Sequence, residues 1–299
     1  MIISEVAVEG FRGLKIATRL KRVNIVFGEN GSGKTSFLES IFMSTLFQSD
    51  MSDYDINSSL LYMLNSRGDS LSAFSTLSSS KVKLDDVTIQ LKRNDPYSLD
   101  VEINGERVAE ITVKAISLLE NQSMPMFLPI ARIEKRVRTR YFPLYISTFF
   151  DVSGNPEKIY SIAKRKSKDK VRADLEILQD VYGQFRLYYG TLPVYVMGRG
   201  LLKRELIKLA LTSSDILLID EIEDSLHPDL VTEVLNDIKR EEGVQVIFTT
   251  HVNEVVKMAG KVLDDSEAQV IYLSKAGYKT YELSEISEFE KPLSWLGYV

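Results

Sequence analysis

A glycine-rich stretch after a short apolar run has the residue types of a phosphate-binding site. It reads Gly28-Glu29-Asn30-Gly31-Ser32-Gly33-Lys34-Thr35-Ser36. Glycines let the backbone bend tightly and approach an anion, so that successive N–H groups and the start of the next helix face phosphate oxygens. In this pattern Lys34 reaches the β- and γ-phosphates, and the Thr35 hydroxyl binds Mg²⁺. β-Branched residues before the stretch and helix formers after it favour a nucleotide site over an ordinary glycine-rich turn.

Two acids, Asp220 and Glu221, follow a second apolar run at 216–219. At the C-terminal edge of a strand beside a nucleotide, Asp220 would hold Mg²⁺ directly or through water. Glu221 would orient and deprotonate the attacking water. Solvated acids at the end of a buried strand are common, so this pattern indicates a catalytic site only in combination with the phosphate loop. Together the two motifs predict hydrolysis of a nucleoside triphosphate, with Lys34 and Glu221 as catalytic residues.

Length and composition predict a large α/β protein. The 299 residues are 44% apolar and 26% charged, which is enough for one large domain or two lobes around a substantial core. No apolar run approaches the roughly 20 residues needed to cross a bilayer, and the N-terminus lacks a signal-peptide pattern. We therefore expect a cytoplasmic protein without membrane contact. The absence of cysteine excludes disulfides and thiol chemistry, and two histidines disfavour a zinc site.

Positive charge is concentrated in two segments of a chain whose net charge is −5. Residues 132–140 carry five basic side chains against one acid, and residues 164–172 carry six against one. The two segments together carry +9, so the rest of the chain is near −14. They are candidates for contact with DNA phosphates, although a run of charge is often only a solvated face.

The first half of the chain combines strands with two helices. Residues 2–9 alternate as a strand, and 10–15 form a turn before a second extended stretch. A helix starts near Lys34 and continues through Leu46, a short helix is expected around 60–64, and 65–80 read as a mobile loop. Residues 81–116 have period-two patterning broken by turns, which predicts an antiparallel meander with Asn104-Gly105 as a hairpin.

The second half has the alternation of a parallel sheet. We expect a buried strand at 142–147 and a long helix at 156–187, with Leu175, Leu178, Tyr182 and Phe185 facing the core. Helices are predicted at 200–211, 228–241 (begun by Pro228) and 253–260, strands at 215–219 and 244–248, and edge strands at 270–273 and 278–283. We divide the chain into a phosphate-loop and meander lobe (1–130), a basic region (131–195) and a C-terminal lobe (196–299).

These motifs resemble the RecF/SMC branch of ABC-type ATPases, and within it most closely the compact ATPase domain of the OLD family and its stand-alone relatives. The likeness rests on the phosphate loop, the two acids, Leu226-His227-Pro228, His251 and the N-terminal stretch 8–14. It implies an ABC-type P-loop NTPase head with a mixed or parallel core sheet and an antiparallel meander lobe. It also implies that Arg12 joins the nucleotide-binding residues and that His251 senses the γ-phosphate. His227 would touch a partner subunit, or cap the helix that Pro228 begins.

Two positions depart from the family pattern. The signature motif falls on 197–204, where Gly198 stands in place of a serine. The resemblance implies phosphate contacts through backbone N–H groups of Gly198 and Gly200, with Arg199 as a further candidate; a plain helix N-terminal turn is the alternative. No glutamine follows the strand at 142–147, so Ser147 or Thr148 would have to fill the role of the Gln loop.

The resemblance implies a Mg²⁺-dependent ATPase that forms an ATP-sandwiched homodimer and acts on or near DNA, in repair or defence. DNA would contact 132–140 and 164–172. The chain leaves no room for a Toprim nuclease, so a nuclease or effector would be a separate chain. One alternative is an ATP-driven switch that moves a protein effector without binding DNA. A transporter nucleotide-binding subunit is disfavoured, because it would carry an intact Leu-Ser-Gly-Gly-Gln and a Gln loop.

Overall fold

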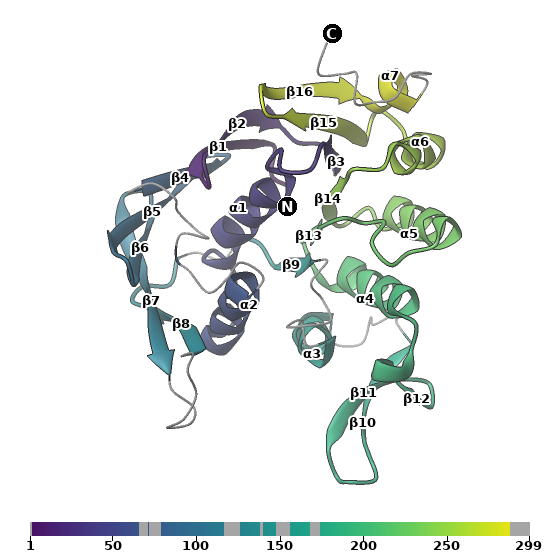
Figure 1. Cartoon of the computed structure of the whole chain (residues 1–299), viewed down its shortest axis with the longest axis horizontal. Coiled ribbons are helices and arrows are strands. Elements are labelled where there is room, and N and C mark those ends of the chain that lie inside the picture. Colours follow the sequence, from purple (N-terminus) through teal and green to yellow (C-terminus); the bar gives the residue numbers. More distant parts are fainter. Residues whose placement is uncertain are drawn as a thin grey trace. The chain divides into compact units, whose positions relative to one another are not determined.

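The protein divides into two compact units. The computed structural model describes residues 2–65, 71, 79–116, 126–137, 140–147, 156–167 and 174–287 (Figure 1). Apart from the first two residues, unit 1 comprises Ile3–Leu20 and Thr35–Phe142, and unit 2 comprises Lys21–Lys34 and Pro143–Val299. These borders differ from the three-part division made from the sequence, because the phosphate loop up to Lys34 falls in unit 2.

Unit 1 is built on a seven-stranded antiparallel sheet in the order β2-β1-β4-β5-β6-β7-β8. Its strands are β1 (Glu5–Phe11), β2 (Leu14–Arg19), β4 (Ser79–Leu84), β5 (Val87–Asp95), β6 (Ser98–Ile103), β7 (Glu106–Ile116) and β8 (Met126–Ile133). The predicted meander is therefore confirmed. Asn104 and Gly105 have φ of 51° and 82° between β6 and β7, as a two-residue type I′ turn requires.

Two helices accompany this sheet. α1 (Lys34–Leu46) joins the end of the phosphate loop to unit 1 and buries Phe37, Leu38 and Ile41. α2 (Asp53–Asn65) begins earlier than the short helix expected at 60–64, because the Ser52 hydroxyl accepts from Asp55 N–H at 3.2 Å and caps it. The expected loop at 65–80 lies largely outside the described residues, and its last two residues begin β4.

Unit 2 is built on a six-stranded sheet in the order β16-β15-β3-β14-β13-β9. Its strands are β3 (Val23–Gly28), β9 (Pro143–Ile146), β13 (Ile216–Ile219), β14 (Gln245–Thr250), β15 (Ala268–Ser274) and β16 (Gly277–Glu282). All neighbours are parallel except β15 and β16. β3, β9, β13 and β14 are buried along their whole length, which explains their continuous apolar runs.

The expectation of two edge strands near the C-terminal end is wrong for the first of them. β15 pairs with β3 on one side and with β16 on the other, and its first six residues are buried. Of these two strands, only β16 lies at an edge of the sheet. The predicted second strand also ends one residue early, because Leu283 begins α7 (Leu283–Ser287).

The helices of unit 2 confirm most of the expected order. Besides α7, the described part of unit 2 has α3 (Pro156–Ser167), α4 (Arg199–Ser213), α5 (Pro228–Arg240) and α6 (Asn253–Val262). Within the described part of the chain, no helix is long and apolar enough to cross a membrane.

The predicted helix over 156–187 is wrong beyond α3. Residues 175–189 form a hairpin of β10 (Leu175–Gln179) and β11 (Phe185–Tyr189), followed by β12 (Leu192–Pro193) and the 3-10 turn η2 (Val194–Val196). Asp180 closes the hairpin by accepting from the N–H groups of Tyr182 and Gln184, and Gly183 has φ of 77°. Leu175 is buried as expected, but Leu178, Tyr182 and Phe185 are exposed.

Candidate active site

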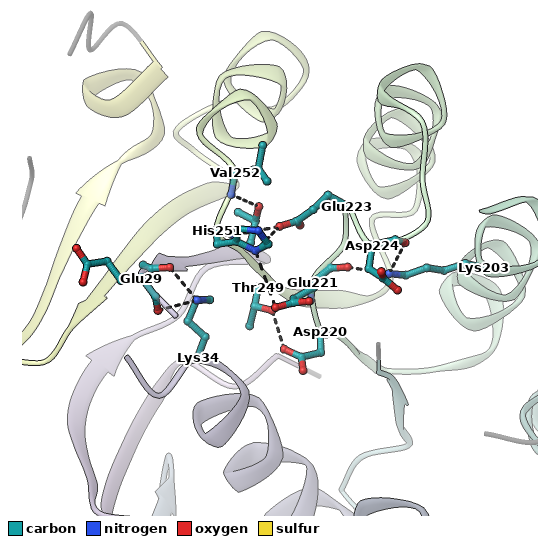
Figure 2. Close-up of polar contacts among 12 residues, drawn as sticks. Glu29, Lys34, Lys203, Asp220, Glu221, Glu223, Asp224, Thr249, His251 and Val252 are labelled. Atoms are coloured by element: carbon teal, nitrogen blue, oxygen red, sulfur yellow. Dashed lines mark hydrogen bonds and ion pairs between the residues drawn. The ribbon is translucent and has the colours of Figure 1, made fainter. Parts of the chain in front are cut away.

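Three neighbouring parallel strands of unit 2 end at one edge of the sheet. β3, β14 and β13 lie side by side, and their last residues lead into the phosphate loop, His251 and the pair Asp220–Glu221. In open α/β sheets, ligands bind outside the carboxyl ends of the strands. Figure 2 shows that Lys34, Asp220, Glu221, Thr249 and His251 gather at this edge. Parallel pairing thus brings together residues from three distant parts of the sequence.

The phosphate loop is shaped by close packing and by glycine conformations. A Cβ atom on Gly28 would lie 2.1 Å from the carbonyl oxygen of Leu273 in β15, so only glycine fits there. Gly31 and Gly33 have φ of 78° and 98°, which L side chains rarely adopt. The Ser32 hydroxyl is buried and has no hydrogen-bond partner among the described residues. An orphaned donor in a glycine cradle fits an anion such as a phosphate group.

Lys34 folds back onto the loop that precedes it. Its Nζ atom donates to the carbonyl oxygens of Gly28 at 2.7 Å and Glu29 at 2.9 Å. Burial lowers the pKa of Lys34, while the carboxylates of Glu221, Asp220 and Glu223 act in the opposite direction. The ammonium group is therefore held in a poorly solvated position, where a phosphate anion would be a favourable partner.

Thr249 connects the two acids that follow β13. Its hydroxyl donates to Asp220 Oδ1 at 2.7 Å and accepts from the backbone N–H of Glu221 at 2.7 Å. Asp220 is only 3% exposed, which leaves it at the base of the site. Glu221 has φ of 46°, an uncommon value for a residue with a side chain. The hydroxyl thus fixes both the Asp220 carboxylate and the backbone that carries Glu221.

Glu221 has the electrostatic surroundings of a proton acceptor. Its pKa is raised by burial first and by the charges of Asp220 and Glu223, and is opposed by His251 and Lys34. His251 Nδ1 lies 3.9 Å from Glu221 Oε1 and 3.1 Å from Glu223 Oε1. Glu223 Oε1 also accepts from the His251 backbone N–H at 3.1 Å. Glu223 therefore orients His251 beside Glu221, and a carboxylate with a raised pKa suits general base chemistry.

The start of α4 lies against the turn that follows Asp220. Gly198 is the N-cap of α4 and makes no side-chain cap. A Cβ atom on Gly200 would lie 2.4 Å from the carbonyl oxygen of Ser225, so the first turn of α4 packs directly on the 221–225 turn. The role of Gly198, Arg199 and Gly200 in contacting a phosphate stays a prediction.

His227 has the capping geometry that was the alternative to a partner contact. It is the N-cap of α5, and its Nδ1 accepts from the backbone N–H of Asp229 at 3.4 Å. The Asp229 carboxylate lies 3.3 Å from the same atom. The capping contact is thus sufficient to explain a histidine before Pro228.

Several expected site residues belong to unit 1 or lie outside the described residues. Thr35 and Ser36 are in the first turn of α1. Arg12 forms an ion pair with Glu39 of α1, and its guanidinium lies 5.5 Å from the centre of the Phe11 ring. Ser147 is buried after β9, whereas Thr148 is among the residues not described. The proposed roles of these residues stay predictions.

Three residues of the site were not identified from the sequence. Thr249 lies between the predicted strand at 244–248 and His251, so a polar residue directly after a buried strand is a usable signal for it. Glu223 lies two residues after Glu221, in the stretch that leads to His227. Lys203 has no such signal, because it is one of several basic residues in α4. Its Nζ donates to the carbonyl oxygens of Glu221 at 2.7 Å and Asp224 at 3.0 Å.

Sequence comparison gives a family match over most of the chain. Residues 23–257 match the AAA_21 family, described as "AAA domain, putative AbiEii toxin, Type IV TA system". This span includes the phosphate loop, both acids and His251.

Curated relatives match over a shorter span. Proteins named "DNA replication and repair protein RecF" from Shewanella sp. (strain W3-18-1) and Shewanella piezotolerans (strain WP3 / JCM 13877) are 32% and 31% identical over 123 residues. The match covers 40% of this chain and 31% of each relative. The chain thus spans about a third of the length of these relatives.

Solved structures confirm the expected fold. An SMC head bound to the C-terminal winged-helix domain of ScpA has a TM-score of 0.54 at 14% identity, and covers 97% of this chain and 100% of that chain. A Pyrococcus furiosus SMC head bound to the C-terminal domain of ScpA has a TM-score of 0.51 at 11% identity, with coverages of 95% and 97%. The α/β fold of an ABC-type P-loop NTPase head is therefore confirmed, while the closer likeness to OLD domains stays a prediction.

Proposed function

Because this chain belongs to the AAA_21 family and to the RecF/SMC branch of ABC-type ATPases, we propose that it binds ATP with Mg²⁺ and hydrolyses it to ADP and phosphate. The observation that supports this most is the network of Asp220, Thr249 and Glu221 at the strand ends next to the phosphate loop. We place the protein in the cytoplasm as part of the same proposal.

In the proposed mechanism, the loop N–H groups, the Ser32 hydroxyl and Lys34 bind the triphosphate. Lys34 exchanges the carbonyl oxygens of Gly28 and Glu29 for phosphate oxygens. Asp220 would hold Mg²⁺ together with Thr35, and the ion would neutralise charge that develops on the phosphates. Glu221 accepts the proton of the attacking water, and His251, oriented by Glu223, hydrogen-bonds at the γ-phosphate.

The direct test is phosphate release from ATP, measured with and without Mg²⁺ and with and without DNA of several forms. Release that requires Mg²⁺ supports the proposal. Absence of release in all conditions, with tight ATP binding retained, would leave a nucleotide-binding protein that is not an ATPase.

The pH dependence of hydrolysis should report the raised pKa of Glu221. A general base acts when deprotonated, so kcat/KM should fall as the pH falls through this pKa. The fall should start at a higher pH than for an ordinary glutamate, whose pKa is about 4.3. Steady-state rates in buffers of constant ionic strength measure the profile. A rate that stays constant down to the ordinary glutamate range would assign the base to another group.

We propose that two copies enclose ATP between them. A single phosphate loop leaves one side of the γ-phosphate open to water, and the start of α4 offers N–H donors at the positive end of a helix dipole. Gly198 at the N-cap has no side chain that could compete with a phosphate for these N–H groups, which supports this assignment.

We further propose that the protein acts on DNA, as the name of the RecF relatives suggests for those proteins. Both basic segments carry exposed basic side chains. In the first, Lys135, Arg136 and Arg140 form ion pairs with Glu106, Asp53 and Asp86, and Arg138 is not described. In the second, Lys164, Arg165 and Lys166 are exposed at the end of α3, and Lys164 Nζ donates to the Tyr160 hydroxyl at 2.9 Å. Because its three described basic residues are adjacent and exposed, the second segment is the one that the next variant changes.

Reversal of Lys164, Arg165 and Lys166 to Glu should weaken DNA binding and leave basal ATP hydrolysis unchanged. Contacts to phosphates are insensitive to sequence, and affinity should fall steeply with salt. Fluorescence anisotropy with random-sequence DNA at several salt concentrations measures the effect. Reversal of the exposed Lys261, Lys275 and Lys279 gives a control with the same change in charge. Equal loss in both variants would mean that only net charge matters.

A second candidate function is a switch that moves a protein effector. The turn of the β10–β11 hairpin carries Val181 and Tyr182, which are 93% and 85% exposed, and Phe185 is 72% exposed. Figure 1 shows this hairpin extending from the end of unit 2 that carries α3 and α4. Clustered exposed apolar side chains are typical of protein contacts. Absence of DNA binding at low salt, with ATP present, would favour this function.

A further inference from the structure

Lys203 is a buried cation whose bonds go to backbone carbonyl groups. It is 4% exposed, and its Nζ donates to Glu221 O at 2.7 Å and Asp224 O at 3.0 Å. Burial lowers its pKa to about 8, although nearby carboxylates act in the opposite direction. An apolar side chain would fill this space without the cost of desolvating an ammonium group. A role in holding the 221–225 turn would explain why a lysine and not an apolar residue occupies position 203.

The turn that Lys203 holds is conformationally unusual. Glu221 and Ser225 have φ of 46° and 63°, and non-glycine residues with such values are stabilised only by their surroundings. The backbone N–H and the backbone C=O of Glu221 are each held by a side chain from another element. Thr249 accepts from its N–H, and Lys203 donates to its C=O (Figure 2). The orientation of the Glu221 side chain therefore depends on both contacts.

Lys203 belongs to the same helix that packs its first turn on this segment. It is one turn beyond Gly200, whose Cα lies against the carbonyl of Ser225. A displacement of α4 would consequently move the Glu221 carbonyl through the Lys203 side chain. The same displacement would also move Ser225, at the other end of the turn, through its contact with Gly200.

We propose that Lys203 is a positioning residue through which α4 sets the orientation of Glu221. This inference rests on the proposed ATPase function and adds a route by which contact at the start of α4 adjusts the catalytic base. Lys203 does not itself touch the nucleotide in this scheme. Its effect on hydrolysis passes through Glu221.

The test is a double-mutant cycle on the full-length chain with Lys203→Met and Glu221→Gln. Lys203→Met should lower kcat about 100-fold, because small displacements of a catalytic group have effects of this size. ATP affinity should be unchanged, since the phosphate loop is untouched. In the Glu221→Gln background, Lys203→Met should cause no further loss of turnover. Lys208→Met, on the same helix with its Nζ 3.4 Å from Glu205 Oε1, is the control and should retain wild-type kcat.

The outcomes separate this inference from the proposed function. No hydrolysis by the wild type overturns both. If Glu221→Gln abolishes hydrolysis and Lys203→Met does not lower it, only the role of Lys203 is overturned. The same conclusion follows if Lys203→Met lowers turnover equally in the wild-type and Glu221→Gln backgrounds. If Lys203→Met does not fold, Lys203→Gln takes its place in the double-mutant cycle, because glutamine keeps a hydrogen-bond donor in a shorter side chain. It should give a kcat between those of the wild type and Glu221→Gln at unchanged ATP affinity.

Discussion

Replacement of Glu221 by Gln should leave ATP binding intact and lower the turnover rate by about 10²- to 10⁴-fold. The amide has the shape of the carboxylate but cannot accept a proton from water. The backbone contacts of residue 221 with Thr249 and Lys203 do not involve its side chain, so the turn should keep its conformation. Phosphate release under saturating ATP measures the rate, and calorimetric titration measures the affinity.

The same variant should accumulate the ATP-bound dimer, because hydrolysis can no longer open it. Light scattering with ATP and Mg²⁺ should show twice the monomer mass, and removal of the nucleotide should return the monomer. Glu242→Gln, at an exposed position outside the site, is the matched control and should behave as the wild type. Hydrolysis by Glu221→Gln at the wild-type rate would transfer the role of general base to another residue.

Replacement of Lys34 by Ala should weaken ATP binding by about 100-fold. The ammonium group neutralises phosphate charge, and hydrogen bonds to charged groups are stronger than those between neutral groups. In the absence of nucleotide, Lys34→Ala affects only contacts within the protein. The carbonyl oxygens of Gly28 and Glu29 lose their donor, while the cost of burying the cation is also removed.

We therefore expect thermal unfolding without nucleotide to change little and the ATP-induced rise in Tm to disappear. Titration with a non-hydrolysable ATP analogue gives the affinity directly. Lys239→Ala removes an exposed lysine that donates to Val262 O and should bind ATP as the wild type does. Unchanged affinity in Lys34→Ala would show that nucleotide binds elsewhere on the protein.

The elements of the fold that were predicted correctly have local causes. The Asn104-Gly105 turn needs two residues that tolerate positive φ, and the sequence supplies them between strands of period two. α5 has Pro228 at its first position and a side chain at 227 that caps it. Buried parallel strands such as β13 are recognisable as uninterrupted apolar runs.

The hairpin at 175–189 shows where local pattern is ambiguous. Leu175, Leu178, Tyr182 and Phe185 are spaced as one face of a helix, which led to the wrong prediction. Leu175, Ile177 and Gln179 are equally spaced as one face of a strand, and pairing with β11 decides in favour of the strand. The Asp180 side chain stabilises the turn only once the chain reverses. Pairing partners are not encoded within the segment itself.

For the candidate site, the phosphate loop, the two acids and His251 were predicted from the sequence, because glycine conformations and the residues that end apolar runs are properties of short segments. Which of these residues lie close together depends on the packing of the folded chain. Thr249 joins Asp220 and Glu221 across a separation of 29 and 28 positions, and Lys203 joins α4 to the same turn across 18. Such contacts follow from the order β3-β14-β13 in a parallel sheet and from the packing of Gly200 on Ser225. Residue type alone does not show whether a lysine is buried or exposed, because burial depends on how the helices and strands pack.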